Sequence, residues 1–185
     1  FKSRANLKVQ EGCENFCTYC IVPYARGPER SRDLNETVED FKQLVDSGFK
    51  EIILSGINIC AYKCGNTDLA GLLEKLVAID GDFRIRLSST EPSPVLPRLF
   101  EVMQGAGGKV CKFLHLPIQH GNDAILKAMG RKYLRSEYAD YVAQARSMMP
   151  NIHIGSDLIV GFPGETEEYF NDSFDFIKSM AFANL

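Results

Sequence analysis

The chain has 185 residues, of which 45% are hydrophobic and 24% charged, and its formal net charge is −3 with a pI near 5.7. That much apolar material is enough for the core of one ordinary globular domain. The acidic balance excludes the basic footprint of a strong nucleic-acid-binding domain. A nucleic-acid substrate would therefore have to be gripped by another part of the protein.

The sequence also lacks the usual signals for export or membrane insertion. No run reaches the roughly 18 apolar residues of a membrane span, and the opening FKSRANL has no signal-peptide pattern. A domain of this size with a normal core needs no disulfides, so its six cysteines suit a reducing compartment as free thiols. We therefore expect a cytoplasmic protein with no membrane contact.

Short apolar strands alternate with segments of helical periodicity along the chain. The expected strands cover residues 7–10, 51–55, 83–89, 112–116 and 152–160. Asn35 can cap the first helix and Gly48 can end it, and Ser136 can cap the longer of two helical pieces after the fourth strand. Apolar spacing predicts further helices near residues 69–77 and 96–103, and Thr166 can cap the last one.

Strands and helices in alternation predict an α/β fold of parallel strands with right-handed crossovers, either a barrel or an open doubly wound sheet. The distinctive strings SGIN, STEP, PIQHG and GFPGET each follow a predicted strand, as does the loop that holds three cysteines. Active sites of barrels gather at this carboxyl edge, which favours the barrel. Because the final AFANL reads as the opening of a sixth strand, we expect a TIM-like barrel truncated near that strand and cut from a longer protein.

Cys13, Cys17 and Cys20 form a C-x3-C-x2-C cluster in the run EGCENFCTYCIVPYARG. Thiolates select zinc, copper(I) or iron–sulfur clusters, and clusters used only for electron transfer normally take four cysteines. Three ligands can hold three irons of a cubane and leave the fourth open. A structural zinc site would be closed by a fourth Cys or His, for which Cys60 and Cys64 are the candidate pair. We interpret that pair as incidental thiols in a loop.

The predicted strand FRIRLSS alternates in polarity, with Arg84, Arg86 and Ser88 on one face. Parallel strands covered by helices are normally apolar on both faces, so arginines pressed against a helix would be costly. The hypothesis is that both arginines face a polar lumen that receives a charged ligand. The alternative is that they are exposed on a frayed strand.

Four long motifs occur in order along the chain: GCENFCTYCIVPYARGPERSR, RIRLSSTEP, HLPIQHGNDAILKAMGR and DLIVGFPGETEEYF. Through them the chain resembles the central domain of radical S-adenosylmethionine (SAM) methylthiotransferases over essentially its whole length. The resemblance implies a partial (β/α)6 barrel and a 4Fe–4S cluster held by Cys13, Cys17 and Cys20. It implies that the amino and carboxylate groups of S-adenosylmethionine chelate the fourth iron.

The same resemblance supplies a chemistry and a domain organisation. An electron from the reduced cluster breaks a carbon–sulfur bond of the sulfonium, and the resulting 5′-deoxyadenosyl radical abstracts hydrogen from an unactivated C–H bond. Residues 1–185 would be the radical SAM core of a longer protein. An upstream domain with a second 4Fe–4S cluster and a downstream RNA-binding domain would lie outside it, so this piece alone should cleave S-adenosylmethionine at most.

The resemblance also implies cofactor contacts in the loops that follow the strands. Tyr19 is expected near the adenine, and Gly161 is expected to shape the backbone where the adenine approaches. The full set of expected S-adenosylmethionine contacts is Tyr19, Ser55, Gly56, Asn58, Glu91, Gln119, Asp157 and Gly161. In that set, Ser55, Gly56 and Asn58 would meet the methionine amino group. Glu91, Gln119 and Asp157 would meet the ribose hydroxyls or that amino group, and ordinary turns or loop hydrogen bonds remain the alternative for each.

Two histidines and a basic stretch carry weaker signals. His115 and His120 lack partners at metal-ligand spacing, so we interpret them as hydrogen-bonded polar residues and not as bases. Arg26, Arg30 and Arg32 lie near the cysteine loop. They form either a solvated loop or a clamp for a polyanionic substrate or the cofactor carboxylate.

The string SSTEP looks closer to enzymes that methylthiolate threonylcarbamoyl-adenosine beside the tRNA anticodon than to those that use isopentenyl-adenosine. A third branch modifies an aspartate of a ribosomal protein. The expected partners are tRNA, bound through the missing domains, and a reductase or flavodoxin-type electron donor. Two rival classes stay open, namely a different radical SAM enzyme and a zinc-stabilised binding module without enzymatic activity.

Overall fold

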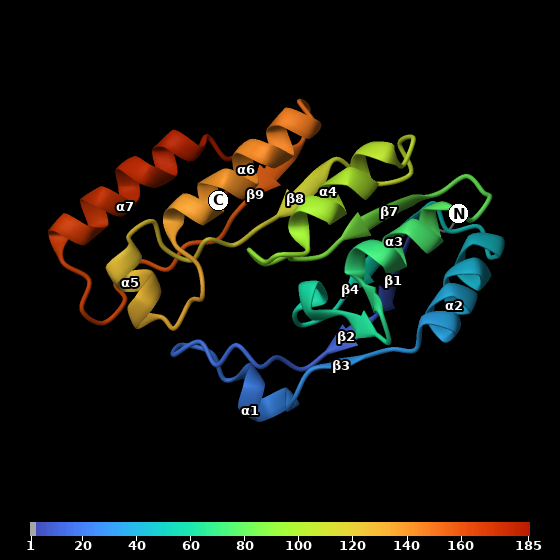
Figure 1. Ribbon diagram of the computed structural model, residues 1–185, viewed down its shortest axis with the longest axis horizontal. Helices are drawn as coiled ribbons and strands as arrows, with labels where there is room; N and C mark the ends of the chain where they lie inside the picture. Colours follow the sequence, from blue (N-terminus) through green and yellow to red (C-terminus); the bar gives the residue numbers. More distant parts are fainter. Residues whose placement is uncertain (1–2) are drawn as a thin grey trace.

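The computed structural model describes residues 3–185 and shows strands and helices alternating along the chain (Figure 1). β1 (Arg4–Lys8), β4 (Glu51–Ser55) and β7 (Arg84–Leu87) form one parallel sheet in that order. β8 (Phe113–His115) pairs in parallel with β9 (His153–Gly155). The predicted α/β class with parallel strands is therefore confirmed.

Two short antiparallel pairs brace the loops that leave the main sheet. β2 (Gln10–Glu11) pairs with β3 (Arg30–Ser31), on either side of the cysteine loop. β5 (Lys63–Cys64) pairs with β6 (Thr67–Asp68), after the short helix η1 (Ile59–Ala61). Both pairs follow strands of the main sheet, so they stiffen the edge where functional side chains were predicted.

The helices are α1 (Val22–Arg26), α2 (Leu34–Asp46), α3 (Leu69–Val77), α4 (Leu96–Gly105), α5 (Asp123–Ala128), α6 (Arg135–Met148) and α7 (Glu167–Met180). Four of them, α2, α3, α4 and α6, follow one another in chain order along one side of the strands, whereas α1 lies by β2 and β3 (Figure 1). α3 packs against α2 and α4, and α4 packs against α6, so these four form a continuous layer (Figure 1). Within residues 3–185, none of the helices combines the length and the apolar character needed to cross a membrane.

Helix starts follow the predicted caps only in part. Thr166 caps α7 as expected, since its hydroxyl accepts a hydrogen bond from a first-turn backbone N–H. Asn35 is not the cap of α2, because Asp33 accepts from two first-turn N–H groups and Asn35 already lies inside the helix. Ser136 is likewise inside α6, whose entry is held by the Glu137 carboxylate accepting from the Leu134 N–H at 2.8 Å.

The last predicted strand is shorter than expected and ends at Gly155 instead of residue 160. Beyond it the backbone pairs with a loop residue: Gln119 N donates to Asp157 O at 2.9 Å and Ile159 N donates to Gln119 O at 2.8 Å. Gln119 lies in the loop after β8 and has a φ of +72°, a backbone conformation that does not occur within a regular β-strand. Next to β9, Asn184 forms an isolated parallel bridge with Gly155.

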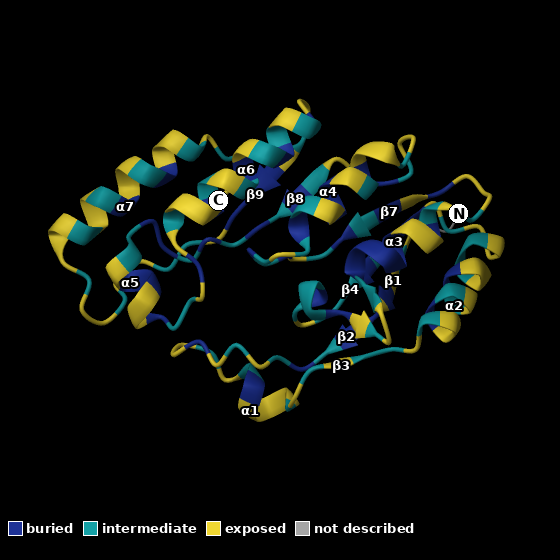
Figure 2. Cartoon of the chain, viewed as in Figure 1, coloured by how far each residue is buried: buried dark blue, intermediate teal, exposed yellow. Residues whose placement is uncertain are grey.

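The core lies between the sheet and the helix layer. Ile52, Leu54, Ile85 and Leu87 alternate along β4 and β7, are at most 2% exposed, and join the same hydrophobic cluster as the inner faces of α2, α3 and α4. β4 is mostly buried, β1 and β7 mix buried with exposed positions, and the outer faces of the helices are exposed (Figure 2). Burial of one sheet face explains why the apolar alternation could be read from the sequence.

The opposite face of the sheet carries the predicted arginines near the amino ends of the strands. Arg84 is exposed, whereas Arg86 donates from Nε to the buried Glu51 carboxylate at 2.8 Å and lies over the Phe113 ring. Arg4 also contacts Glu51, at 2.8 Å. The charge of Arg86 is therefore met by a side chain of the protein, and its position needs no charged ligand to explain it.

Glu51 should make a pH-dependent contribution to stability. Its hydrogen bond from Arg86 holds its pKa below the ordinary value of 4.5. A depressed carboxyl pKa stabilises the fold above the unfolded-state pKa, and that stability is lost as pH falls through the folded-state pKa. Glu51→Gln should cost about 1–3 kcal/mol at pH 7 and progressively less below about pH 4.5, measured by urea unfolding across this range.

Asp82→Asn is the matched control. Asp82, like Glu51, forms an ion pair, with Lys50 at 2.7 Å, but the Asp82 side chain is 92% exposed. An exposed pair of this kind contributes little to stability, because solvent and salt screen it. An equal loss of stability in the two variants at pH 7 would show that the buried position of Glu51 is unimportant.

Candidate functional site

The three clustered cysteines line one cavity. Cys13, Cys17 and Cys20 follow β2 and border a hollow of about 220 Å³. In residues 3–185 all six cysteines are free thiols. The sequence spacing has therefore brought three unpaired sulfurs around a single space, as a ligand set for a metal cluster requires.

The cysteine loop is anchored to distant parts of the chain. Thr18 N donates to Met129 O at 3.0 Å and Thr18 Oγ1 donates to Ala128 O at 3.1 Å, which fastens the loop to the end of α5. At Gly12, with a φ of +76°, a Cβ atom would lie 2.0 Å from the Pro28 carbonyl oxygen. A side chain there would clash with backbone, so glycine is required where the loop begins.

Gln10 joins this loop to the loop after β4. The side chain is buried, its Nε2 donates to Gly12 O at 2.8 Å, and its Oε1 accepts from Asn58 N at 2.8 Å. The ideal Cβ position of Gly56 lies 2.9 Å from the Gln10 carbonyl oxygen, so the two backbones touch. The sequence analysis did not single out Gln10, because one glutamine at a strand end carries no signal of its own.

The three thiols have the chemistry that an iron–sulfur cluster needs. In residues 3–185 no group of three or more His, Cys, Asp or Glu side chains is gathered closely enough to hold one metal ion. In a 4Fe–4S cluster each thiolate binds a different iron, so the sulfurs surround a volume instead of a point. Burial raises the pKa of the Cys13 thiol, which must lose its proton when it binds iron.

Four of the eight predicted cofactor contacts line the same cavity as the cysteines: Tyr19, Asn58, Glu91 and Gln119. In the described chain, Asn58 Oδ1 is buried and has no hydrogen-bond partner. A buried acceptor left without a donor is costly, so an unpaired oxygen at a cavity wall fits a site that receives a ligand with N–H or O–H groups. Burial raises the pKa of the Tyr19 phenol, which therefore stays neutral.

The other four predicted contacts are not among the cavity-lining residues. Ser55 ends β4 and accepts a backbone hydrogen bond from Val9 at 2.8 Å, and Gly56 packs on Gln10. Asp157 pairs with His115, and Gly161 donates its N–H to Glu165. Their contacts with a cofactor stay predictions.

Arg131 is a cavity residue that the sequence analysis missed. Its side chain is only 7% exposed. It donates to Glu91 Oε1 at 2.5 Å and to Cys17 Sγ at 3.1 Å, and lies over the Tyr133 ring. Glu91 is held from its other side by Asn15 at 2.6 Å. Arg131 lies just after the turn that ends α5. Basic residues are common at the ends of helices, so the sequence alone did not distinguish this arginine from the others.

The basic stretch near the cysteine loop does not reach the cavity. Arg26 and Arg30 lie 3.7 and 3.8 Å from the Glu11 carboxylate, and Arg32 pairs with Asp40 at 2.8 Å. None of the three arginines is among the cavity-lining residues. Within the described chain they act as partners of surface carboxylates, which agrees with the solvated-loop reading.

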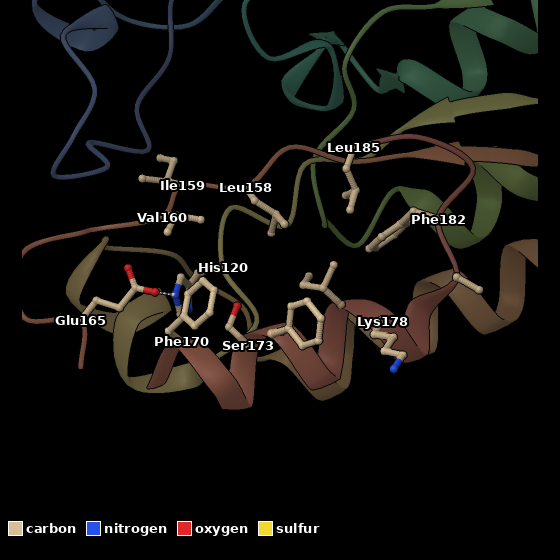
Figure 3. Close-up of a pocket in the computed structure, with 13 residues that line it drawn as sticks. His120, Leu158, Ile159, Val160, Glu165, Phe170, Ser173, Lys178, Phe182 and Leu185 are labelled. Atoms are coloured by element: carbon tan, nitrogen blue, oxygen red, sulfur yellow. Dashed lines mark hydrogen bonds and ion pairs between the residues drawn. The ribbon is translucent and has the colours of Figure 1, made fainter. Parts of the chain in front are cut away.

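A second, larger cavity is apolar and lies away from the cysteines (Figure 3). It measures about 500 Å³ between α7 and the segment after β9, with Phe170, Phe174 and Val160 among its walls. Its polar lining residues include the buried pair of His120 Nε2 and Glu165 Oε1, at 3.1 Å, together with Ser173 and Lys178. His120 is thus a hydrogen-bonded polar residue, as predicted, and so is His115, which contacts Ser89 and Asp157.

Comparison with protein-family models assigns residues 7–177 to the family described as the Radical SAM superfamily. The chain belongs to the radical SAM superfamily. This superfamily uses a 4Fe–4S cluster and S-adenosylmethionine, and methylthiotransferases carry a second cluster in an N-terminal domain. The three thiols around the polar cavity are the residues of this chain that fit such a cluster.

The chain is similar to curated tRNA methylthiotransferases of two kinds. It is 45% identical over 187 residues to the threonylcarbamoyladenosine tRNA methylthiotransferase MtaB of Bacillus subtilis, covering 100% of this chain and 41% of that protein. It is also 45% identical over 183 residues to the tRNA-2-methylthio-N(6)-dimethylallyladenosine synthase of Anaplasma phagocytophilum, covering 97% and 41%. The chain therefore spans well under half the length of these relatives.

Solved structures with low sequence identity share the fold. The radical S-adenosylmethionine methyltransferase TsrM of Kitasatospora setae superposes with a TM-score of 0.79 at 18% identity, over 97% of this chain and 34% of that one. At this identity the match speaks for the architecture alone.

Removing the Gln10 side chain should loosen the cysteine loop. Gln10→Ala leaves Gly12 O and Asn58 N without their buried partner, so we expect a loss of about 1–3 kcal/mol in unfolding free energy. We also expect fewer irons per chain after anaerobic reconstitution with iron and sulfide. The exposed Gln43, changed to Ala, is the control. Wild-type stability and iron content in Gln10→Ala would contradict the anchoring role.

Proposed function

We propose that this chain is the radical SAM core of an enzyme, a transferase that methylthiolates a modified adenosine next to the tRNA anticodon. The observation that carries the proposal is the convergence of Cys13, Cys17 and Cys20 on one polar cavity, in a chain 45% identical to tRNA methylthiotransferases. The three thiols would hold a 4Fe–4S cluster, with one iron left for S-adenosylmethionine. When bound, these two cofactors supply one-electron chemistry that breaks a carbon–sulfur bond of the sulfonium.

The residues around the cavity have the chemistry to bind the amino acid part of S-adenosylmethionine. Arg131 is the cation of the cavity wall, and a guanidinium pairs well with a carboxylate. Glu91 offers a carboxylate for the ammonium group, and Asn58 Oδ1 offers an acceptor without an internal donor. Tyr19 and Gln119 lie on the same wall and would contact the adenosine part.

The remaining predicted contacts would act from positions just outside the cavity. Asp157 is joined to the cavity residue Gln119 by a backbone hydrogen bond of 2.9 Å. Ser55 and Gly56 precede Asn58 in the loop after β4, and Gly161 follows the segment that carries Asp157. Their proximity to lining residues supports their assignment as further contacts for the cofactor.

For the substrate we favour threonylcarbamoyl-adenosine over isopentenyl-adenosine. The string SSTEP supports this choice, and relatives with names of both kinds are equally identical to the chain at 45%. Methylthiolation of an aspartate in a ribosomal protein is the alternative within the resemblance. The tRNA-directed names of the relatives support the first reading.

The proposal includes an architecture and partners. The strands would form a partial (β/α)6 barrel, which the parallel bridge between Gly155 and Asn184 supports as the start of a sixth strand. Other domains of the protein would carry a second 4Fe–4S cluster and grip tRNA, because this chain covers 41% of its relatives and has a net charge of −3. A reductase or flavodoxin-type protein would donate electrons, and the reaction would take place in the cytoplasm.

Cluster binding is tested by removing one thiol. The full-length protein, reconstituted anaerobically with iron and sulfide, should show a 4Fe–4S spectrum that changes when S-adenosylmethionine is added. Cys17→Ala should abolish the full cluster signal, whereas Cys64→Ser, whose thiol lies outside the cavity, should keep it. Iron and sulfide content and electron paramagnetic resonance measure both. A complete 4Fe–4S signal in Cys17→Ala, or a spectrum indifferent to S-adenosylmethionine, would overturn the proposal.

The substrate is tested in cells that lack the protein. We expect mass analysis of tRNA nucleosides to show loss of the methylthio form of threonylcarbamoyl-adenosine and accumulation of the unmodified form. Expression of the wild-type protein should restore the methylthio form, and expression of the Cys17→Ala variant should not. Loss of the isopentenyl derivative instead would refute our choice of nucleoside. An unaltered tRNA pool would refute tRNA as the substrate.

A further inference from the structure

Three polar side chains form a hydrogen-bonded row across the carboxyl ends of three neighbouring strands. Ser89, after β7, places its hydroxyl 2.7 Å from Nδ1 of His115, which ends β8. The other ring nitrogen, Nε2, lies 3.2 Å from Oδ1 of Asp157, which follows β9. Ser89 lines the cysteine cavity, so the row leads from that cavity to Asp157 outside it.

The backbone holds this row in place. Thr90, next to Ser89, donates from both its N–H and its hydroxyl to the carbonyl of His115, at 2.8 and 2.9 Å. His115 is the register partner of Gly155 in the parallel pair, and Asp157 lies two residues beyond Gly155. Side chains two positions apart in an extended chain share a face, which explains why the ring reaches the carboxylate.

The two contacts indicate which tautomer the neutral ring of His115 adopts. A carboxylate can only accept a hydrogen bond, so Nε2 must carry the hydrogen that points to Asp157. In the neutral imidazole, Nδ1 is then the acceptor, and the Ser89 hydroxyl donates its proton to it. Because the Ser89 hydroxyl donates its proton to His115, its oxygen can still accept a hydrogen bond from another donor. Ser89 lines the cavity.

We propose that His115 is a positioning residue of the S-adenosylmethionine site, which fixes the Asp157 carboxylate and makes Ser89 an acceptor. The inference rests on the proposed function, because it takes the cavity as the place where this cofactor binds. The groups recognised would be hydrogen-bond donors of a nucleoside–amino acid ligand: ribose hydroxyls at Asp157, and a hydroxyl or ammonium at Ser89. Neither His115 nor Ser89 follows from the cysteine motif.

Asp157 needs such a partner because its side chain is 60% exposed. A free carboxylate on the surface would sample several rotamers and would lose that freedom when a ligand binds. The bond from His115 restricts the carboxylate beforehand through Oδ1, and Oδ2 is the oxygen that can accept from the ligand. The side chain of His115 is itself 24% exposed, so the ring is held by its two bonds and its backbone clamp.

The test measures ligand binding, with S-adenosylhomocysteine as the probe. This compound keeps the ribose and the amino acid but has no sulfonium to cleave. Calorimetry on the full-length, anaerobically reconstituted protein compares wild type with His115→Ala, Asp157→Ala and the double variant. We expect His115→Ala to weaken binding about tenfold in the wild-type background and clearly less in the Asp157→Ala background, because part of the effect of the ring passes through the carboxylate.

A conservative pair of variants separates positioning from a merely structural role. In His115→Gln the amide nitrogen can take the place of Nε2 and donate to Asp157, whereas the shorter side chain of His115→Asn reaches only the place of Nδ1. We expect the Gln variant to bind at least about fivefold more tightly than the Asn variant, with equal iron content and melting temperature. His153→Gln is the control, since His153 is exposed at the start of β9 and should bind as wild type does.

The outcomes separate this inference from the function on which it rests. Tight binding by wild type together with unchanged binding by His115→Ala overturns the positioning role alone. Simple addition of the His115→Ala and Asp157→Ala effects, or equal binding by the Gln and Asn variants, overturns it as well. A wild-type protein that carries its cluster but binds no S-adenosylhomocysteine and no S-adenosylmethionine overturns the proposed function, and the inference with it.

Discussion

The parallel register of β1, β4 and β7 is the constraint on which the site depends. Leu7, Leu54 and Leu87 are register partners in the three strands, so the segments that follow these strands all leave the sheet at the same edge. Every following segment must then begin at this edge, and the loops with the cysteines, Asn58 and Glu91 meet there by geometry. Gln10 converts this proximity into a fixed arrangement, because its buried amide bonds to two of these loops at once.

In the cavity at that edge, the guanidinium of Arg131 donates hydrogen bonds to several acceptors. Arg131 lies between the Glu91 carboxylate and the Cys17 sulfur, with the Tyr133 ring below it. A buried arginine without partners would be costly, so Glu91, Cys17 and Tyr133 offset the cost of burying Arg131 at the cavity wall.

The sequence was sufficient for what repeats or clusters along the chain. Helix and strand periodicity gave the α/β class, and Cys13, Cys17 and Cys20 could be grouped because they lie within eight residues. It was insufficient where a contact joins distant segments through one ordinary residue. Arg131 lies 40 positions from Glu91, and nothing local marks either as a partner of the other. The misplaced caps at Asn35 and Ser136 have a similar cause. The Asp33 carboxylate accepts from the N–H groups of Asn35 and Glu36, and the Glu137 carboxylate accepts from the N–H of Leu134, so each helix starts earlier than predicted.

His115, which ends β8, and His120, in the loop that follows, show how such distant contacts organise the edge. His115 joins the loop after β7 to Asp157, and His120 donates from Nε2 to Glu165, which also accepts from the N–H groups of Gly161 and Phe162. Although burial opposes ionisation, these hydrogen bonds hold the pKa of Glu165 below its ordinary value. The loop after β9 is thus fixed on both sides of Leu158, by one histidine toward the polar cavity and by the other beside the apolar one. A loop fixed in this way has lost much of its conformational freedom in the folded protein, so any group that contacts Asp157 or Gly161 would order them at little further cost in entropy.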